Sequence, residues 1–163
     1  MKELYNYVKS LSIEQVYNYV MENNKSHNLP YHNNFHLENV TLFTIKGCVD
    51  SSIPKPNMRL AATAALFHDM NHTGSGKNDD LNIIEAVKSF LDFNSKFELF
   101  EDEEQEIIIS LIQATRYPYT KECGDLNILQ RIIRDSDILQ GPFCQNYING
   151  VVFGIAKEAN IPL

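Results

Sequence analysis

Hydrophobic residues recur at helical spacing along most of the chain, whereas the alternation typical of strands is weak throughout. Near the amino terminus, Val16, Tyr19 and Val20 share one helical face. They follow Ser12-Ile-Glu-Gln15, a sequence typical of a capping box at a helix start. The pattern predicts an all-α fold. It places further helices from about residue 35, from about residue 57, over 80–93, 102–117 and 127–140, and after Pro142.

Two breaks divide the first half of the chain. Residues 25–34 are rich in asparagine and contain Pro30, and residues 51–56 contain two prolines, so both segments are predicted to be loops. The chain has no internal repeat, low-complexity tract or linker-like run. A single helical domain is therefore expected over residues 1–163.

The helix expected from about residue 57 is rich in alanine, with the sequence Arg-Leu-Ala-Ala-Thr-Ala-Ala-Leu-Phe at residues 59–67. Small side chains on several faces predict a central, closely packed helix. This helix runs directly into His68 and Asp69. An acidic residue at the end of a buried helix is costly unless it is paired or bound to a metal, so Asp69 is a candidate for either role.

Four of the five histidines lie in two short segments, Tyr31-His-Asn-Asn-Phe-His36 and Phe67-His-Asp-Met-Asn-His72. Each segment contains two histidines four residues apart, and at the start of a helix His32 and His36 would share one face. Imidazole nitrogen and carboxylate oxygen are the ligands that many divalent metals prefer. A single histidine pair at this spacing is more often a helix cap or a surface group, but two pairs beside an acidic residue favour a metal site.

Two further carboxylates, Asp135 and Asp137, lie in the apolar segment 131–139. Two residues apart on a helix, they project about 200° from each other and cannot both face one site. Helical phase places Asp137 on the side of Ile133 and Asp135 on the side of Arg131. Phase alone does not decide which of the two is functional.

The ordered set His…His-Asp…Asp on an all-helical chain of this length resembles the HD superfamily of metal-dependent phosphohydrolases. Two motifs, Tyr31-His32-Asn33-x-x-His36 and His68-Asp69-x-x-His72-x-Gly74, are similar to the signature of the class I 3′,5′-cyclic nucleotide phosphodiesterases. The resemblance extends over roughly residues 30–140 and implies a single HD-domain helical bundle.

The resemblance implies a metal site with the four ligands His36, His68, Asp69 and Asp137. It favours Asp137 over Asp135 because the family's last ligand follows a small residue, here Ser136, and precedes an apolar one. The metal would be a divalent ion of Mn, Mg, Zn, Fe, Co or Ni. Asp69 would also bridge to a second ion, completed mostly by water.

The catalytic residues implied by the resemblance are His32, His72 and Asp69. His32 matches the family's general acid, which protonates the departing ester oxygen, and His72 would lie beside the second ion and its waters. Tyr31 and Asn33 are expected to shape the loop. Lys77 could add a phosphate contact, although a solvated loop lysine is the favoured interpretation.

The chain departs from the phosphodiesterase pattern in three ways. The chain ends at Leu163, without the long carboxy-terminal region that carries a glutamine and an aromatic clamp for the base. Gln140 and Phe143 are tempting substitutes, but nothing in the sequence supports their placement. Asn71 stands where an acidic residue is common. No histidine follows His72, which disfavours the di-iron oxygenases and the cyclic-di-nucleotide hydrolases of the superfamily.

The expected function is therefore a metal-dependent hydrolysis of a nucleotide or another small phosphate ester by a metal-activated water. Two alternatives remain. One is an HD-fold metal oxygenase, which the missing histidines disfavour. The other is a non-catalytic nucleotide-binding HD module, although such modules usually lose ligands and here the set is complete.

Composition narrows the partners and the location. The net charge of −7 disfavours long nucleic acids and anionic membranes, but metal ions can still attract a phosphate ester. The start MKELYNYVKS is unlike a signal peptide and no long apolar run occurs, so a cytoplasmic location is expected. Cys48, Cys123 and Cys144 have no Cys-x-x-Cys spacing, which predicts buried, reduced thiols.

Overall fold

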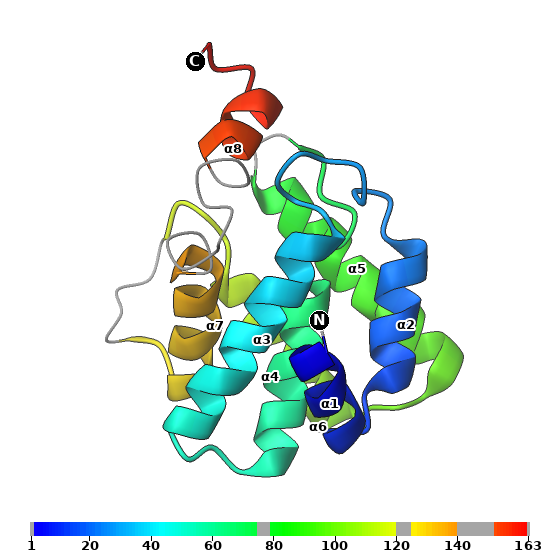
Figure 1. Cartoon of the computed structure of the whole chain (residues 1–163). Helices are drawn as coiled ribbons and strands as arrows, with labels where there is room; N and C mark the ends of the chain where they lie inside the picture. Colours follow the sequence, from blue (N-terminus) through cyan, green and yellow to red (C-terminus); the bar gives the residue numbers. More distant parts are fainter. Residues whose placement is uncertain (1, 75–78, 120–124, 140–151, 163) are drawn as a thin grey trace.

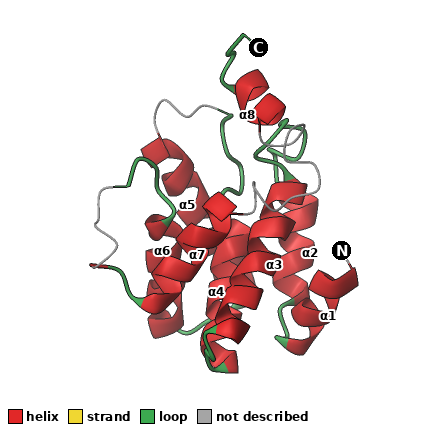
Figure 2. Ribbon diagram, turned by 60° about the vertical axis from the view of Figure 1, so that its left-hand side comes forward, coloured by secondary structure: helices red, strands yellow, loops and turns green. Residues whose placement is uncertain are grey.

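The computed structural model describes residues 2–74, 79–119, 125–139 and 152–162, and the secondary-structure elements of these ranges are eight α-helices without a strand (Figures 1 and 2). The prediction of an all-α fold is confirmed. The helices are α1 (Lys2–Ser10), α2 (Glu14–Asn23), α3 (Asn34–Asp50), α4 (Lys55–Phe67), α5 (Asp79–Phe97), α6 (Asp102–Ala114), α7 (Ile128–Leu139) and α8 (Phe153–Glu158).

The alanine-rich helix α4 is the centre of the bundle, as its composition predicts. It contacts α2, α3, α5, α6 and α7. Its alanines and Phe67 are fully buried, and Phe67 packs against Phe90 and Phe93 of α5. Because small side chains let neighbouring helices approach from several directions, α4 can end inside the molecule, where His68 and Asp69 follow.

The predicted capping box at Ser12 is wrong. Helix α2 has Ile13 at its N-cap position without a side-chain cap bond, and Ser12 adopts a left-handed backbone with φ of 55°. Ile13 is fully buried, and its N–H donates to the carbonyl of Val8. The turn that places Ile13 in the core therefore overrides the local capping preference of serine.

Three helix boundaries differ from those predicted, each for a local reason. Helix α4 begins before Pro56, because proline is tolerated in a first turn where its missing N–H would be unpaired anyway. Helix α5 continues to Phe97, whose ring packs against Phe93. Helix α6 ends at Ala114 instead of continuing to Tyr117, which precedes a proline and is therefore disfavoured in a helix.

Some sequence predictions fall on residues outside the described ranges, namely Lys77, Gln140, Phe143, Cys123 and Cys144. Cys48 is buried as predicted, and burial raises the pKa of its thiol to about 11. Within the described ranges, no helix is both long and apolar enough to cross a membrane.

Helices α3 and α7 approach each other closely at Gly47. A Cβ atom at Gly47 would lie 3.0 Å from Cγ2 of Ile132. The missing side chain allows α7 to pack against α3, and this packing brings the carboxy-terminal half of α7 to the amino-terminal half of α3 (Figure 1).

Gly47→Ala should destabilise the fold. Alanine gains about 1 kcal/mol of helix propensity over glycine, but overpacking a tight contact typically costs about 1–3 kcal/mol. We expect a net loss of up to about 2 kcal/mol in the free energy of unfolding, measured by urea denaturation. Val49→Ala, on an exposed position of the same helix, should change this energy by less than about 0.5 kcal/mol. A Gly47→Ala variant as stable as the wild type would mean that Ile132 can move aside freely.

Candidate metal centre

The start of α3 places His36 in the core and His32 outside the helix. Asn33 is the N-cap residue, with an extended backbone, and its side chain accepts hydrogen bonds from the N–H groups of Phe35 and His36. Asn33 thus shapes the loop, as expected. His32 lies in the loop predicted over residues 25–34, and the cap at Asn33 separates it from the helix that carries His36, so the two histidines do not share a helical face.

The other three expected ligands come from the end of α4 and from α7. His68 and Asp69 follow the last residue of α4 in a turn, closed by a hydrogen bond from the N–H of His72 to the carbonyl of Asp69. Asp137 lies near the end of α7 and faces them, whereas Asp135 is exposed and lines a different hollow. Packing of α7 thus selects between two carboxylates that helical phase alone did not separate.

Four side-chain atoms converge at this point. Nε2 of His36 lies 3.2 Å from Nε2 of His68 and 3.1 Å from Oδ2 of Asp69, and Nε2 of His68 lies 3.2 Å from the same oxygen. Oδ1 of Asp137 is 3.3 Å from Nε2 of His36 and 3.5 Å from Nε2 of His68. Bonds of about 2.0–2.2 Å to one metal ion put neighbouring ligand atoms roughly 3.0–3.5 Å apart, so this group could hold a metal ion.

The rings are oriented for metal binding. Nδ1 of His68 lies 2.8 Å from the carbonyl oxygen of Ala65. Because a carbonyl only accepts, Nδ1 carries a hydrogen, and in the neutral ring Nε2 is then a bare ligand atom. Nδ1 of His36 is buried and has no hydrogen-bond partner among the described residues, so only its Nε2 faces polar groups.

Mutual pairing dominates the electrostatics of the four residues. Burial alone would lower the pKa values of His36 and His68, but the carboxylates of Asp69 and Asp137 outweigh it and raise both. Burial alone would raise the pKa values of the two aspartates, but the histidines lower them, that of Asp137 to about 2. Without a metal, the cluster therefore holds protons on imidazole and negative charge on carboxylate.

A second group, formed by His32, His72 and Glu158, lies beside the first. Nδ1 of His32 is 2.6 Å from Oε2 of Glu158, and Oε1 of Glu158 accepts from the N–H groups of Tyr31 (2.5 Å) and His32 (2.9 Å). Nε2 of His32 lies 3.9 Å from Oδ2 of Asp69. Sequence reasoning missed Glu158, which lies 126 residues after His32 on the short helix α8 and belongs to no motif.

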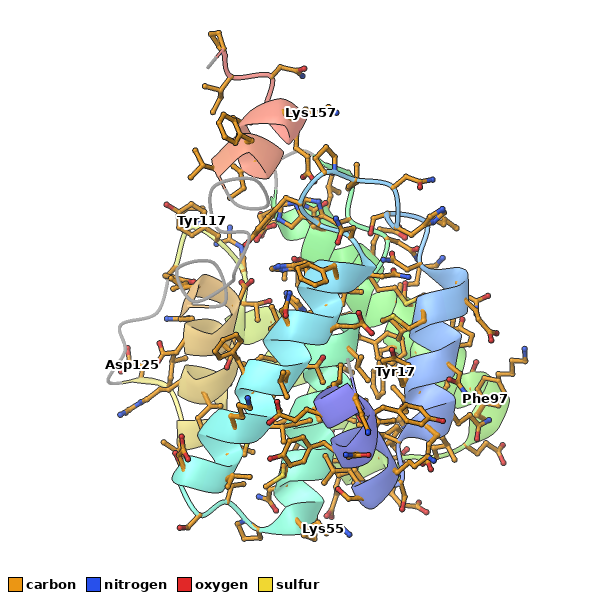
Figure 3. All side chains as sticks on the ribbon, viewed as in Figure 1. Tyr17, Lys55, Phe97, Tyr117, Asp125 and Lys157 are labelled. Carbon is orange, nitrogen blue, oxygen red and sulfur yellow. The ribbon has the colours of Figure 1, made fainter. Side chains whose placement is uncertain are left out.

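Helix α8 reaches the site by a close approach to the loop before α3. A Cβ atom on Gly154 would lie 3.0 Å from the carbonyl oxygen of Pro30. The absence of a side chain at Gly154 thus lets α8 lie against this loop, which puts Glu158 within reach of His32. Figure 3 shows α8, with Lys157, at the same end of the molecule as Tyr117 and at the opposite end from Lys55.

His72 supports His32 by stacking. The two rings are nearly parallel, with an interplanar angle of 17° and centroids 3.6 Å apart. Both nitrogens of His72 lie near protein groups: Nδ1 accepts from the N–H of Gly74, and Nε2 is 2.9 Å from Nδ2 of Asn82. Burial and the neighbouring His32 lower the pKa of His72 to about 4, so His72 is neutral near pH 7. These contacts therefore suit a role in which Glu158 and His72 support the imidazole of His32 better than a role as a second set of metal ligands.

Asn71 ties the turn after α4 to two neighbouring segments. It adopts a left-handed backbone with φ of 65°, which asparagine tolerates better than most residues. Its N–H donates to Oδ1 of Asn24, its Oδ1 accepts from the N–H of Lys25, and its Nδ2 donates to Ser89. The amide of Asn71 can both donate and accept hydrogen bonds. An ionised acidic residue, which is common at this position in the phosphodiesterases, can only accept them.

No protein-family model, curated protein or solved structure matches this chain.

The stability of the metal-free protein should depend on pH through His36 and His68. The folded-state pKa values of these two residues are raised, so they stabilise the fold below the unfolded value of about 6.5, and this contribution disappears as pH rises through the folded values. The lowered pKa of His72 acts in the opposite sense, with one ring against two. The lowered pKa values of Asp69 and Asp137 stabilise the fold above about 4. With chelator, Tm measured by circular dichroism should fall from pH 6 to pH 8.5.

Mn²⁺ should reverse this trend, because binding requires neutral imidazole rings. The difference in Tm between loaded and chelated protein should grow with pH over the same range. A chelated protein with the same Tm at pH 6 and pH 8.5 would contradict the raised pKa values.

Asp137 and Asp135 offer a matched pair for testing the ligand set. Asp137→Asn should weaken Mn²⁺ binding by at least about 100-fold, because it removes a ligand charge. Asp135→Asn removes the same charge from an exposed position two residues away and should change the affinity by less than about threefold. Titration calorimetry measures both, and similar losses would contradict Asp137 as a ligand.

Proposed function

We propose that this chain is an HD-type metal-dependent phosphohydrolase that cleaves a nucleotide or another small phosphate ester with a metal-activated water. The observation that carries the proposal is the convergence of His36, His68, Asp69 and Asp137, with neighbouring ligand atoms 3.1–3.5 Å apart. When bound, a divalent cation would polarise the phosphoryl group and lower the pKa of a bound water towards 7.

His32 is proposed as the general acid. Its Nδ1 is held by Glu158, while its Nε2 lies 3.9 Å from Oδ2 of Asp69, and both residues line the cavity beside the ligand cluster. Burial would raise the pKa of Glu158, but the hydrogen bond from His32 outweighs it and lowers that pKa, so the carboxylate stays charged. Nε2 can then donate a proton to the leaving oxygen, while the N–H at Nδ1 keeps its hydrogen bond to Glu158.

The two alternative functions are less well supported. An oxygenase with a second iron would need further nitrogen ligands. The one histidine outside the two groups, His27, has both ring nitrogens in other contacts. Its Nδ1 forms a hydrogen bond with the carbonyl oxygen of Asn24, and its Nε2 contacts the amide of Asn28. A binding module would need no oriented proton donor, whereas Glu158 and His72 together position and support His32.

The test is a series of phosphate diesters with substituted phenyl leaving groups, from p-nitrophenyl to phenyl, assayed with Mn²⁺. His32→Gln should lower kcat about 10²–10⁴-fold on the phenyl ester, whose leaving oxygen needs a proton. On the p-nitrophenyl ester, the loss should be less than about tenfold. Glu158→Gln should steepen the leaving-group dependence in the same direction, and metal content should stay unchanged in both variants.

His27→Gln is the matched control, because it makes the same substitution at an exposed loop histidine. It should leave kcat unchanged on every ester. Equal losses across the series for His32→Gln would reject general-acid catalysis. Absence of Mn²⁺-dependent hydrolysis in the wild-type protein would reject the phosphohydrolase itself.

A further inference from the structure

A cavity of about 400 Å³ opens beside the candidate metal centre. His32, Asp69 and Asp137 line the cavity and connect it to the cluster. Further lining residues come from α5, the segment after α6, α7 and α8, namely Ile83, Tyr117, Tyr119, Ile138 and Ile155. The volume of the cavity lies within the roughly 300–1,000 Å³ typical of small-molecule pockets. The position of the cavity suits the organic part of an ester whose phosphoryl group binds at the metal.

Much of the remaining lining is apolar or aromatic. Tyr119 is half-buried, and the guanidinium of Arg134 lies 4.0 Å from its ring centroid. Burial and the neighbouring Asp137 raise the pKa of Tyr119 to about 12, so its hydroxyl stays neutral. The ring of Tyr117 stands nearly perpendicular to it, with centroids 5.6 Å apart. Such a lining suits a flat, ring-bearing group, because rings stack well on aromatic side chains.

The charges on the pocket are unfavourable to additional phosphates. Among the described lining residues there is no lysine or arginine, and the guanidinium of Arg134 contacts the ring of Tyr119 without being a lining group itself. Asp79 faces the cavity at the start of α5. Its carboxylate is fixed by the N–H of Tyr117, 2.6 Å from Oδ2, and by Nδ2 of Asn82, 3.2 Å from Oδ1. A phosphoryl group beyond the one at the metal would therefore meet a carboxylate and no cation from these residues.

We infer that this pocket selects esters with one phosphoryl group and a flat, ring-bearing organic group, and that Asp79 is the residue that rejects a second phosphate. The inference rests on the proposed function, because the metal centre determines where the phosphoryl group binds.

The test compares the binding of adenosine 5′-monophosphate, adenosine 5′-diphosphate and inorganic phosphate to the Mn²⁺-loaded protein by calorimetry, at fixed free Mn²⁺. The wild type should bind the monophosphate at least about tenfold more tightly than either of the others. Asp79→Asn should reduce the preference for the monophosphate over the diphosphate about tenfold, because the repelling charge is removed. Tyr119→Leu should weaken monophosphate binding and leave phosphate binding unchanged.

Asp92→Asn is the matched control. It removes the same charge from an exposed position on α5, about 20 Å along the helix from Asp79, and should leave the preference unchanged. Equal affinity of the wild type for the monophosphate and the diphosphate would overturn the inference. So would an unchanged preference in Asp79→Asn, or a lack of monophosphate binding.

Hydrolysis of bis-p-nitrophenyl phosphate by the same preparations separates this inference from the proposed function. Mn²⁺-dependent hydrolysis without a preference for the monophosphate rejects the selective pocket alone. A preference for the monophosphate without hydrolysis rejects the hydrolase alone.

Discussion

The arrangement of this protein depends on bringing two buried imidazole rings and two partly buried carboxylates to one point. Burying any one of these charges alone would be costly, and only their mutual pairing, or a shared metal ion, makes the burial tolerable. The four groups come from the start of α3, the end of α4 and the end of α7. The cluster therefore constrains how these three helices can sit against one another. The small residues of α4 and Gly47 of α3 provide the close packing that such an arrangement requires.

The parts of the fold that the sequence predicts well are those determined locally. Helical spacing and the alanines of α4 are local properties, and both predict the observed helices and the buried centre. The choice between Asp135 and Asp137 is not local, because both sit on the same helix and only the packing of α7 on α3 determines which one faces His36. A family resemblance favoured Asp137, and the structure independently places it there.

The features that sequence reasoning missed depend on contacts between distant segments. Glu158 becomes meaningful only because α8 lies against the loop that holds His32, and its own short helix carries no recognisable motif. Ser12 has the residue type and spacing of a cap, yet burial of Ile13 demands a different turn. The spacing of His32 and His36 would give a shared face only on a helix, and the N-cap at Asn33 leaves His32 in the loop before α3.

Glu158 lies on α8, whereas the four candidate metal ligands lie on α3, in the turn after α4 and on α7. The support of His32 therefore depends on the docking of α8, and the four-ligand group does not. Undocking of this short helix would leave the candidate metal ligands together and remove the carboxylate that holds His32.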